Sequence, residues 1–230
     1  MLHHCDALKC FPPFLRLKEP INERRDFRGY NLLDLKYLDK NNRKGYDMSF
    51  QILANTTRFS QLLDTYKTKK VILQERSLAA GIYVFAQRSR KEGSLTNLNY
   101  ELLEKWLNVV NRSFLSDIVN PDLIIYLDVP AEKCFERLKE RNRVEERNLE
   151  LRDLQDIERF YEQWLDSKHC WCPVLRIKND EKSNSTTEVI SAIKAKILME
   201  RFLKTRRNKA NEEMIQELEI EHEVGEITTP

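Results

Sequence analysis

Three arginines in the middle of the chain follow residues suited to a buried strand and a helix. Leu123–Val129 is nearly continuous in apolar and β-favouring residues, a pattern typical of a strand covered on both faces of a parallel sheet. Pro130 ends this run, and the amphipathic segment after it carries Arg137, Arg141 and Arg143. Guanidinium groups bind phosphate oxygens two at a time, and open α/β sheets bind phosphates at the carboxyl edge of their strands. The pattern therefore indicates a phosphate-binding arm, although a solvated charged helix accounts for the same composition.

A second group of charged residues stands at the end of another strand-like run. Val71–Leu73 is apolar, and Glu75, Arg76 and Ser77 follow it closely. A carboxylate suits a hard cation that bridges phosphates, and a guanidinium stabilises the negative charge that builds during phosphoryl transfer. The spacing indicates a site for a metal-bound phosphate, and a salt bridge at the strand end is the alternative.

A carboxylate also follows the first strand-like run, Phe14–Leu17. A hydroxyl is a poor nucleophile until a base accepts its proton, and Glu19 could be such a base. Taken in isolation, Lys18-Glu19-Pro20 is more simply interpreted as an ordinary polar turn.

The remaining elements alternate as in an α/β fold. Helices are expected at residues 31–37, 49–66, 98–118, 151–164 and 187–203, with a last strand at 173–177. Ser49 is the expected N-cap of the second helix, after a polar loop. Strand and helix alternation predicts right-handed β-α-β units and a parallel sheet of about four strands flanked by helices. The apolar stripe from Leu98 to Ile118 is broad enough to serve both the core and a partner subunit.

Composition narrows the class of protein. A chain of 230 residues with 41% hydrophobic and 33% charged residues suits one globular domain with a tail. The net charge of +2 is too small to imply a nucleic-acid surface, and no apolar run approaches the length of a membrane span. The five cysteines lack zinc-knuckle spacing, which favours reduced thiols over a metal site. The first 20 residues show neither a secretory core nor an arginine-rich amphipathic pattern.

These motifs resemble those of the deoxynucleoside kinase family, which includes deoxycytidine, deoxyguanosine and mitochondrial thymidine kinases and multisubstrate insect enzymes. The family has a lid Arg-x-Arg-x-Glu-Glu, here Arg141–Glu146, and an Asp/Glu-Arg-Ser motif, here Glu75–Ser77. Its Glu-Pro-x-x-x-Trp motif is matched by Glu19–Arg24. The resemblance covers about residues 15 to 203. It implies a P-loop-kinase-like parallel sheet flanked by helices, and transfer of the ATP γ-phosphate to the 5′-hydroxyl of a deoxynucleoside.

The resemblance also implies roles for single residues. Glu19 would be the general base, Glu75 would help place Mg²⁺, and Arg76 would stabilise charge together with Arg137, Arg141 and Arg143, called the lid arginines below. Tyr37 and Glu146 would hold the sugar 3′-hydroxyl, and Gln51 and Phe85 the base. The full set implied for the nucleoside is Leu33, Tyr37, Gln51, Ala54, Arg58, Phe85 and Glu146.

Three features depart from the family. Arg24 replaces the Trp of the Glu-Pro motif, which alters the aromatic wall of the base pocket. Gly81 stands where deoxycytidine kinase-like members have an acid that partners the arginine matched by Arg58, so the base preference is open. The five glycines, at 29, 45, 81, 93 and 225, do not form a G-x-x-x-x-G-K-[ST] loop, and only 18 residues precede Glu19. The first strand and the phosphate loop are therefore expected to be missing.

The expected organisation is a divergent segment at 1–14, a kinase-like domain at 15–205 and a charged tail at 206–230. The expected function is nucleotide salvage by a truncated and catalytically impaired kinase, with a deoxynucleoside, ATP and a second copy of the chain as partners, and neither nucleic acid nor membrane. The alternative is a non-catalytic structural or regulatory relative, of the type of the respiratory complex I accessory subunit that shares this fold. The expected location is cytoplasmic, with mitochondrial as the alternative.

Overall fold

The structure, a computed structural model, describes residues 14–37, 43–65, 71–113 and 115–178, together with Ser191 and Lys196. The strands are β1 Phe14–Leu17, β2 Val71–Gln74, β3 Ile124–Asp128 and β4 Val174–Lys178. The helices are α1 Ile21–Arg25, α2 Leu32–Tyr37, α3 Arg43–Thr65, α4 Leu78–Ala80, the π-helical turn η2 Gly81–Ala86, α5 Gln87–Lys91, α6 Asn97–Arg112, α7 Ser116–Val119, α8 Ala131–Arg141, the 3-10 turn η3 Val144–Glu146 and α9 Leu151–Leu165.

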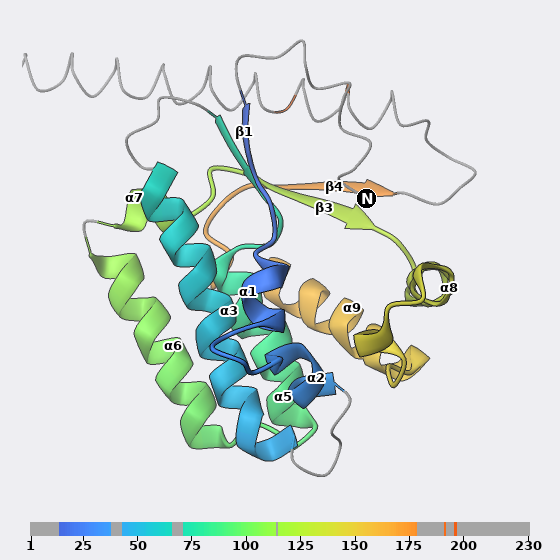
Figure 1. The fold of residues 1–230 in the computed structure, drawn as a ribbon. Helices are drawn as coiled ribbons and strands as arrows, with labels where there is room; N and C mark the ends of the chain where they lie inside the picture. The colour runs from blue at the N-terminus through green and yellow to red at the C-terminus, as the bar shows by residue number, and fades with distance from the viewer. Residues whose placement is uncertain are drawn as a thin grey trace, which may run out of the picture.

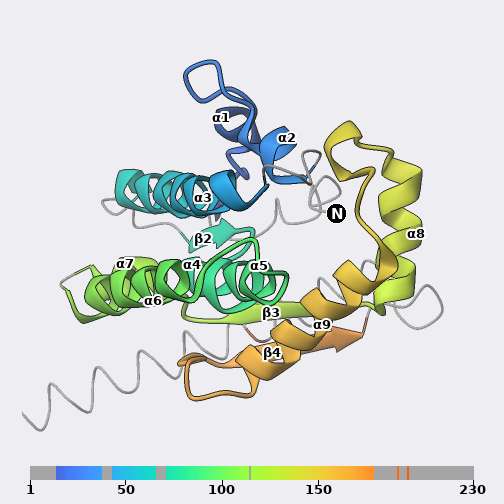
Figure 2. The ribbon, with the colours of Figure 1, turned by 90° about the horizontal axis from the view of Figure 1, so that it is seen from below.

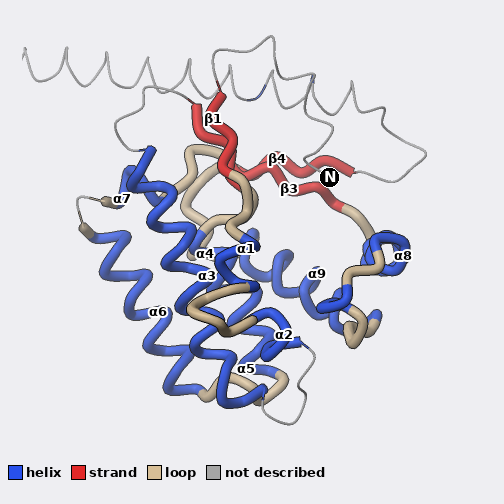
Figure 3. The backbone as a smooth tube through the Cα atoms, in the orientation of Figure 1, coloured by secondary structure: helices blue, strands red, loops and turns tan. Residues whose placement is uncertain are grey.

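The strands form two parallel pairs, β1 with β2 and β3 with β4 (Figures 1 and 3). Phe14 is opposite Val71 in the first pair, and Ile124 is opposite Val174 in the second. The predicted α/β class with parallel strands is confirmed. The strands are arranged as two pairs rather than as one continuous sheet, and β3 is half-buried along its length rather than covered on both faces.

The centre of the helical layer is the continuous helical stretch from α4 through η2 to α5. Ser77 caps its start, since its Oγ accepts a hydrogen bond from the Ala80 amide. The turn η2 contacts α3, α6 and α9, and Ile82 and Val84 within it are fully buried. Figure 2 shows α5 between α3 and α6 on one side and α9 on the other. A π-helical turn inside an α-helix is frequent at functional sites, and this one ends one residue beyond Phe85.

Two predicted helix boundaries are wrong. Helix α3 begins at Arg43, so Ser49 lies inside the helix instead of capping it. The single helix expected from Leu98 to Ile118 is two helices, α6 and α7, because Ser113 ends the first: its hydroxyl donates to the Val110 carbonyl and accepts from the Leu115 amide. The apolar spacing continues across this break, so periodicity alone could not reveal it.

The lid region follows β3. Pro130 precedes α8, and Asn142 ends that helix in the left-handed backbone region, with φ of 49°. The turn η3 follows, and then α9, whose start carries a capping box between Glu150 and Asp153. No helix in the described ranges is long and apolar enough to cross a membrane. The tail expected at 206–230 lies outside the described residues, and so does the helix expected at 187–203 apart from Ser191 and Lys196.

Candidate active site

Glu19 lies just beyond the carboxyl end of β1, and three arginines surround its carboxylate. Arg24 Nη1 donates to Glu19 Oε1 at 2.6 Å, and Arg58 Nη2 reaches the same oxygen at 3.4 Å. Arg76 Nη1 lies 3.8 Å from it. Arg24 comes from α1, Arg58 from α3 and Arg76 from the end of β2, so three elements far apart in sequence converge on one carboxylate. The structure thus brings together the predicted Glu19, Arg58 and Arg76 and adds Arg24.

The electrostatics of this group favour an ionised Glu19. Burial by itself would raise the pKa of Glu19, but the positive charges of Arg76, Arg24 and Arg58 outweigh it and hold the pKa below 4.5. Burial, with the positive charges of Arg24 and Arg76, lowers the pKa of Arg58 to about 9. The carboxylate therefore carries its charge at neutral pH and can accept a proton, while burial and the neighbouring arginines disfavour the positive charge of Arg58.

Arg76 adopts a backbone conformation that few non-glycine residues adopt. Its φ of 66° lies in the left-handed region, which costs free energy for a side chain with a Cβ. Its guanidinium lies 4.3 Å from the ring centroid of Phe85, within reach of a cation–π contact. Phe85 in turn makes an edge contact with Tyr161 of α9, at 6.1 Å between centroids. The strained backbone places the guanidinium between the carboxylate of Glu19 and the ring predicted to stack on the base.

A small apolar cluster forms the second part of the site. Leu33 of α2 is buried with Phe50 and Ala54 of α3, and Tyr37 packs partly buried against them. The Tyr37 and Phe50 rings meet edge to face, 6.1 Å apart between centroids. Leu33, Tyr37 and Ala54 were all predicted to line the nucleoside pocket, and the structure places them side by side.

A buried ion pair lies under this cluster. The side chains of Lys36 and Asp47 are 2% and 0% exposed, and Lys36 Nζ donates to Asp47 Oδ1 at 2.6 Å. Asp47 also accepts from Ser94 Oγ and, at 3.4 Å, from Gln51 Nε2. The amide of Gln51, predicted to read the base, is therefore held by a carboxylate from its own helix. Neither member of the ion pair was predicted as a site residue, although a lysine within the otherwise apolar spacing of α2 was a usable signal.

Gly81 explains why Arg58 lacks an acidic partner on the next helix. A Cβ at position 81 would lie 2.5 Å from Asn55 Oδ1. Asn55 is buried and its Nδ2 donates to the Gln51 carbonyl at 2.8 Å, so it fills the space beside Gly81. An acidic side chain at 81 would require Asn55 to move, and Glu19 takes the role of counter-ion to Arg58 instead.

The lid residues pair with one another and with α1. Arg141 Nη2 donates to Glu146 Oε2 at 2.6 Å, and Arg143 Nη1 lies 3.5 Å from Glu146 Oε1. Arg25 Nε donates to Glu145 Oε1 at 2.7 Å and so ties the lid to the helix that carries Arg24. Within the part of the chain that the structure describes, these lid arginines contact Glu146 and not Glu19. The turn η3, which carries Glu146, also contacts α2, which carries Tyr37, so the shared role predicted for Glu146 and Tyr37 at the sugar stays a prediction.

Two predicted residues remain at the edges of the site. Arg137 on α8 has a buried Nη1 that finds no partner among the described residues. Glu75 is exposed beside Arg76, and none of the described residues forms a group of three ligands for a metal ion. Mg²⁺ in phosphoryl-transfer sites usually takes one or two carboxylates, with substrate phosphates and water completing its shell. Glu75 fits that arrangement, in which it would hold the ion only together with a bound phosphate.

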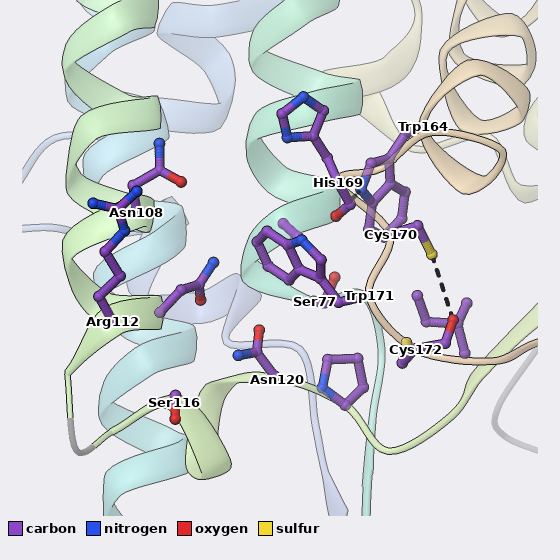
Figure 4. Close-up of a pocket in the computed structure, with 14 residues that line it drawn as sticks. Ser77, Asn108, Arg112, Ser116, Asn120, Trp164, His169, Cys170, Trp171 and Cys172 are labelled. Carbon is purple, nitrogen blue, oxygen red and sulfur yellow. Dashed lines mark hydrogen bonds between the residues drawn. The ribbon is translucent and has the colours of Figure 1, made fainter.

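A separate cavity of about 500 Å³ is lined in part by Ser77 (Figure 4). Asn108 and Arg112 of α6 line one side, and Trp164, His169 and Trp171 line the opposite side. It reaches the amino ends of β3 and β4, at Ile124 and Cys172, whereas α/β enzymes bind ligands at the carboxyl ends of parallel strands. Because none of the predicted site residues lines it, this cavity is not the candidate active site.

Comparison with known proteins agrees with this geometry. The family model described as deoxynucleoside kinase matches residues 6–200. Human mitochondrial thymidine kinase 2 is 30% identical over 188 residues, which are 79% of this chain and 67% of that protein. Mitochondrial deoxyguanosine kinase of Xenopus laevis is 33% identical over 60% of this chain and 53% of its own length. Deoxycytidine kinase 2 of Gallus gallus is 33% identical over 61% and 54%. The chain therefore spans from about half to about two thirds of these relatives.

The match covers both strand pairs and every described residue of the candidate site, from Glu19 to Glu146. The relatives' names refer to three different nucleosides, so the similarity defines the family and not the base. On this similarity, and on the parallel strands and site described above, the chain belongs to the deoxynucleoside kinase family.

Proposed function

We propose that the site binds a deoxynucleoside and directs its 5′-hydroxyl to the γ-phosphate of ATP. The observation that supports this most strongly is the convergence of Glu19, Arg58 and Arg76 next to the cluster of Leu33, Tyr37 and Ala54. An ionised carboxylate beside guanidiniums is suited to accept a hydroxyl proton while negative charge develops on the transferring phosphoryl group. The base would lie between Phe85 and Gln51, with its sugar toward Tyr37.

The roles of the remaining residues follow from their positions. The ammonium of Lys36 keeps Asp47 ionised, and Asp47 in turn orients the amide of Gln51. The lid arginines Arg141 and Arg143 would exchange part of their contact with Glu146 for donor phosphate oxygens when ATP binds. Mg²⁺, placed by Glu75 and the phosphates, would supply charge neutralisation at the donor.

Nucleoside binding and turnover with ATP depend on different parts of this site, so an experiment can measure them separately. The 230 residues hold no G-x-x-x-x-G-K-[ST] loop. We therefore expect the 230-residue polypeptide to bind a deoxynucleoside but to show no turnover with Mg-ATP, because the loop supplies several hydrogen bonds to phosphate, each worth about 1.5–3 kcal/mol. Calorimetric titration with the four deoxynucleosides, beside a radiolabelled ATP assay, measures both properties.

A matched variant and a chimera complete this test. Gln51→Leu should weaken nucleoside binding roughly tenfold, because the base loses its polar partner. A chimera in which the first strand and phosphate loop of thymidine kinase 2 precede residue 15 should gain turnover. A chimera that folds, binds ATP and still shows no turnover would contradict the proposed activity, and absence of nucleoside binding by either protein would favour a structural relative.

Helix α6 presents an apolar face that suits a second copy of the chain. Leu98, Leu102 and Val109 are exposed at helical spacing, while Leu103 and Leu107 on the other face are buried in the core. Exposed apolar stripes of this kind are typical of protein–protein interfaces. We expect light scattering at micromolar concentration to give twice the chain mass of 27.5 kDa. Leu102→Glu should give a monomer and the exposed control Glu101→Gln should not, whereas a monomeric parent chain would reject the interface.

The names of the relatives bear on which of the two expected compartments applies. Two of the similar proteins are named as mitochondrial, which supports the mitochondrial alternative for this protein. Subcellular fractionation of source cells tests this, and recovery in the cytosolic fraction alone would reject it.

A further inference from the structure

The arginines around Glu19 offer more hydrogen-bond donors than the protein uses. Arg24 is 3% exposed, and its Nε and Nη2 have no partner among the described residues. The Nε of Arg58, which is also buried, is likewise without a partner. Buried guanidinium N–H groups without acceptors are costly, and a native structure usually satisfies them with protein, water or a ligand.

The same group has an excess of positive charge. Three guanidiniums face the single carboxylate of Glu19, to which Arg24, Arg58 and Arg76 all point. Glu75 lies near Arg76 but is exposed, so solvent screens its charge. The excess is therefore between one and two positive charges around a partly buried carboxylate.

The site is also open on one side. The side chains of Arg24 and Arg58 form its buried floor, whereas Glu19 is 21% and Arg76 36% exposed. An anion that entered past Arg76 would meet the unused donors of Arg24 and Arg58 at the floor. Glu19 is the group beside which the proposed reaction places the 5′-oxygen.

We propose that Arg24, with Arg58 and Arg76, forms an anion site for the 5′-phosphate of a deoxynucleoside monophosphate. A phosphate monoester carries about −1.5 to −2 charges at neutral pH, which matches the excess positive charge of the cluster. Its three oxygens accept the planar pairs of N–H groups that guanidiniums present. This inference rests on the proposed function, because it takes the nucleoside to lie with its 5′-end at Glu19.

The consequence is preferential retention of the phosphorylated nucleoside. The phosphate that the reaction adds would itself be bound by Arg24, so release of the monophosphate would be slow relative to release of the nucleoside. Arg24 is thus a specificity-determining residue, because it makes the acceptor site bind a ligand with a 5′-phosphate more tightly than one with a free 5′-hydroxyl.

Calorimetric titration of the 230-residue chain tests this directly, with the four deoxynucleosides, their 5′-monophosphates and inorganic phosphate as probes. We expect at least one monophosphate to bind roughly tenfold or more tightly than its nucleoside. Arg24→Met should remove this difference, because the phosphate then loses the donors at the floor of the site. The control Arg28→Gln, at an exposed position four residues further along, changes the net charge equally and should keep the difference.

Two further measurements keep the outcomes distinct. Circular dichroism shows whether Arg24→Met is folded. If Arg24→Met is unfolded, Arg24→Lys replaces it in the test. Arg24→Lys keeps the charge but loses the planar pair of N–H groups, so it should give an intermediate preference for the monophosphate. A monophosphate that binds no more tightly than its nucleoside, or a preference unchanged by both Arg24 substitutions, overturns the anion site but leaves nucleoside binding intact. Binding of neither compound overturns the anion site and the proposed function together.

Discussion

Asp47→Ala is expected to lower the free energy of unfolding by about 3–5 kcal/mol, because it leaves the ammonium of Lys36 buried without its counter-ion. Lys36 is 2% exposed, and besides Asp47 its ammonium donates to Ser89 Oγ at 3.1 Å and lies over the rings of Phe50 and Tyr37. Urea denaturation followed by circular dichroism measures this loss.

Two variants separate the ion pair from the loss of a side chain. In Lys36→Met/Asp47→Ala neither charge is buried, so most of the stability should return. Asp64→Ala, at an exposed position on the same helix, should change stability by no more than about 0.5 kcal/mol. A double variant as unstable as Asp47→Ala would show that packing, not charge, determines the effect.

The same ion pair contributes to pH dependence. Burial by itself would raise the pKa of Asp47, but the Lys36 ammonium and the hydrogen bonds from Lys36 and Ser94 outweigh it and hold the pKa below 3.8. A lowered folded-state pKa stabilises the protein above the pKa of the unfolded chain, and this contribution is lost as the pH falls toward the folded value. The parent chain should therefore lose stability more steeply than the double variant below about pH 4.

Glu19→Gln is expected to lower kcat by roughly 10²–10⁴-fold in the chimera that carries a donor loop, since the amide cannot accept the proton of the 5′-hydroxyl. The amide keeps the shape of the side chain, so KM for the nucleoside should change little. Glu23→Gln, exposed on α1 four residues away, is the matched control and should retain activity.

The pH profile distinguishes a base from a merely structural carboxylate. Because the three arginines hold the pKa of Glu19 below 4.5, the activity of the parent chimera should persist until the pH falls below that value. The residual activity of Glu19→Gln should lack this acid limb. Equal acid limbs in both proteins would assign the base to another group.

Local sequence patterns were sufficient for the strands and for α9. The apolar runs at Phe14–Leu17 and Val71–Leu73 are short and continuous, and the apolar spacing of α9 is regular, so each signal lies within the element itself. The start of α3 could not be predicted in this way. Its first turns are polar, and Asp47 becomes a core residue only because Lys36 comes from a different helix to meet it.

The candidate site, like the fold, could be predicted from the sequence only in part. The resemblance to the family's motifs pointed to Glu19, Arg58 and Arg76, and the structure brings both guanidiniums to the Glu19 carboxylate. The departure at Arg24 was visible in the sequence, but its effect was not, because the direction of its side chain depends on where α1 packs. The exposed and buried faces of α6 likewise depend on which neighbours cover the helix.

Each of the two strand pairs is assembled within its own part of the chain. Residues paired in β1 and β2 lie within 14–74, and those paired in β3 and β4 within 124–178. Of the side chains proposed for the acceptor site, Glu19, Gln51, Arg76 and Phe85 precede residue 86, whereas Glu146 belongs to the later part. Helix α9 joins the later part to this one by packing on η2 and α5. Phe160, Trp164 and Leu165 of α9 are buried in the same hydrophobic core as Leu17, Leu78 and Ile82 of the earlier part. The two strand pairs therefore share one core, and we expect the chain to unfold in a single cooperative transition rather than one part at a time.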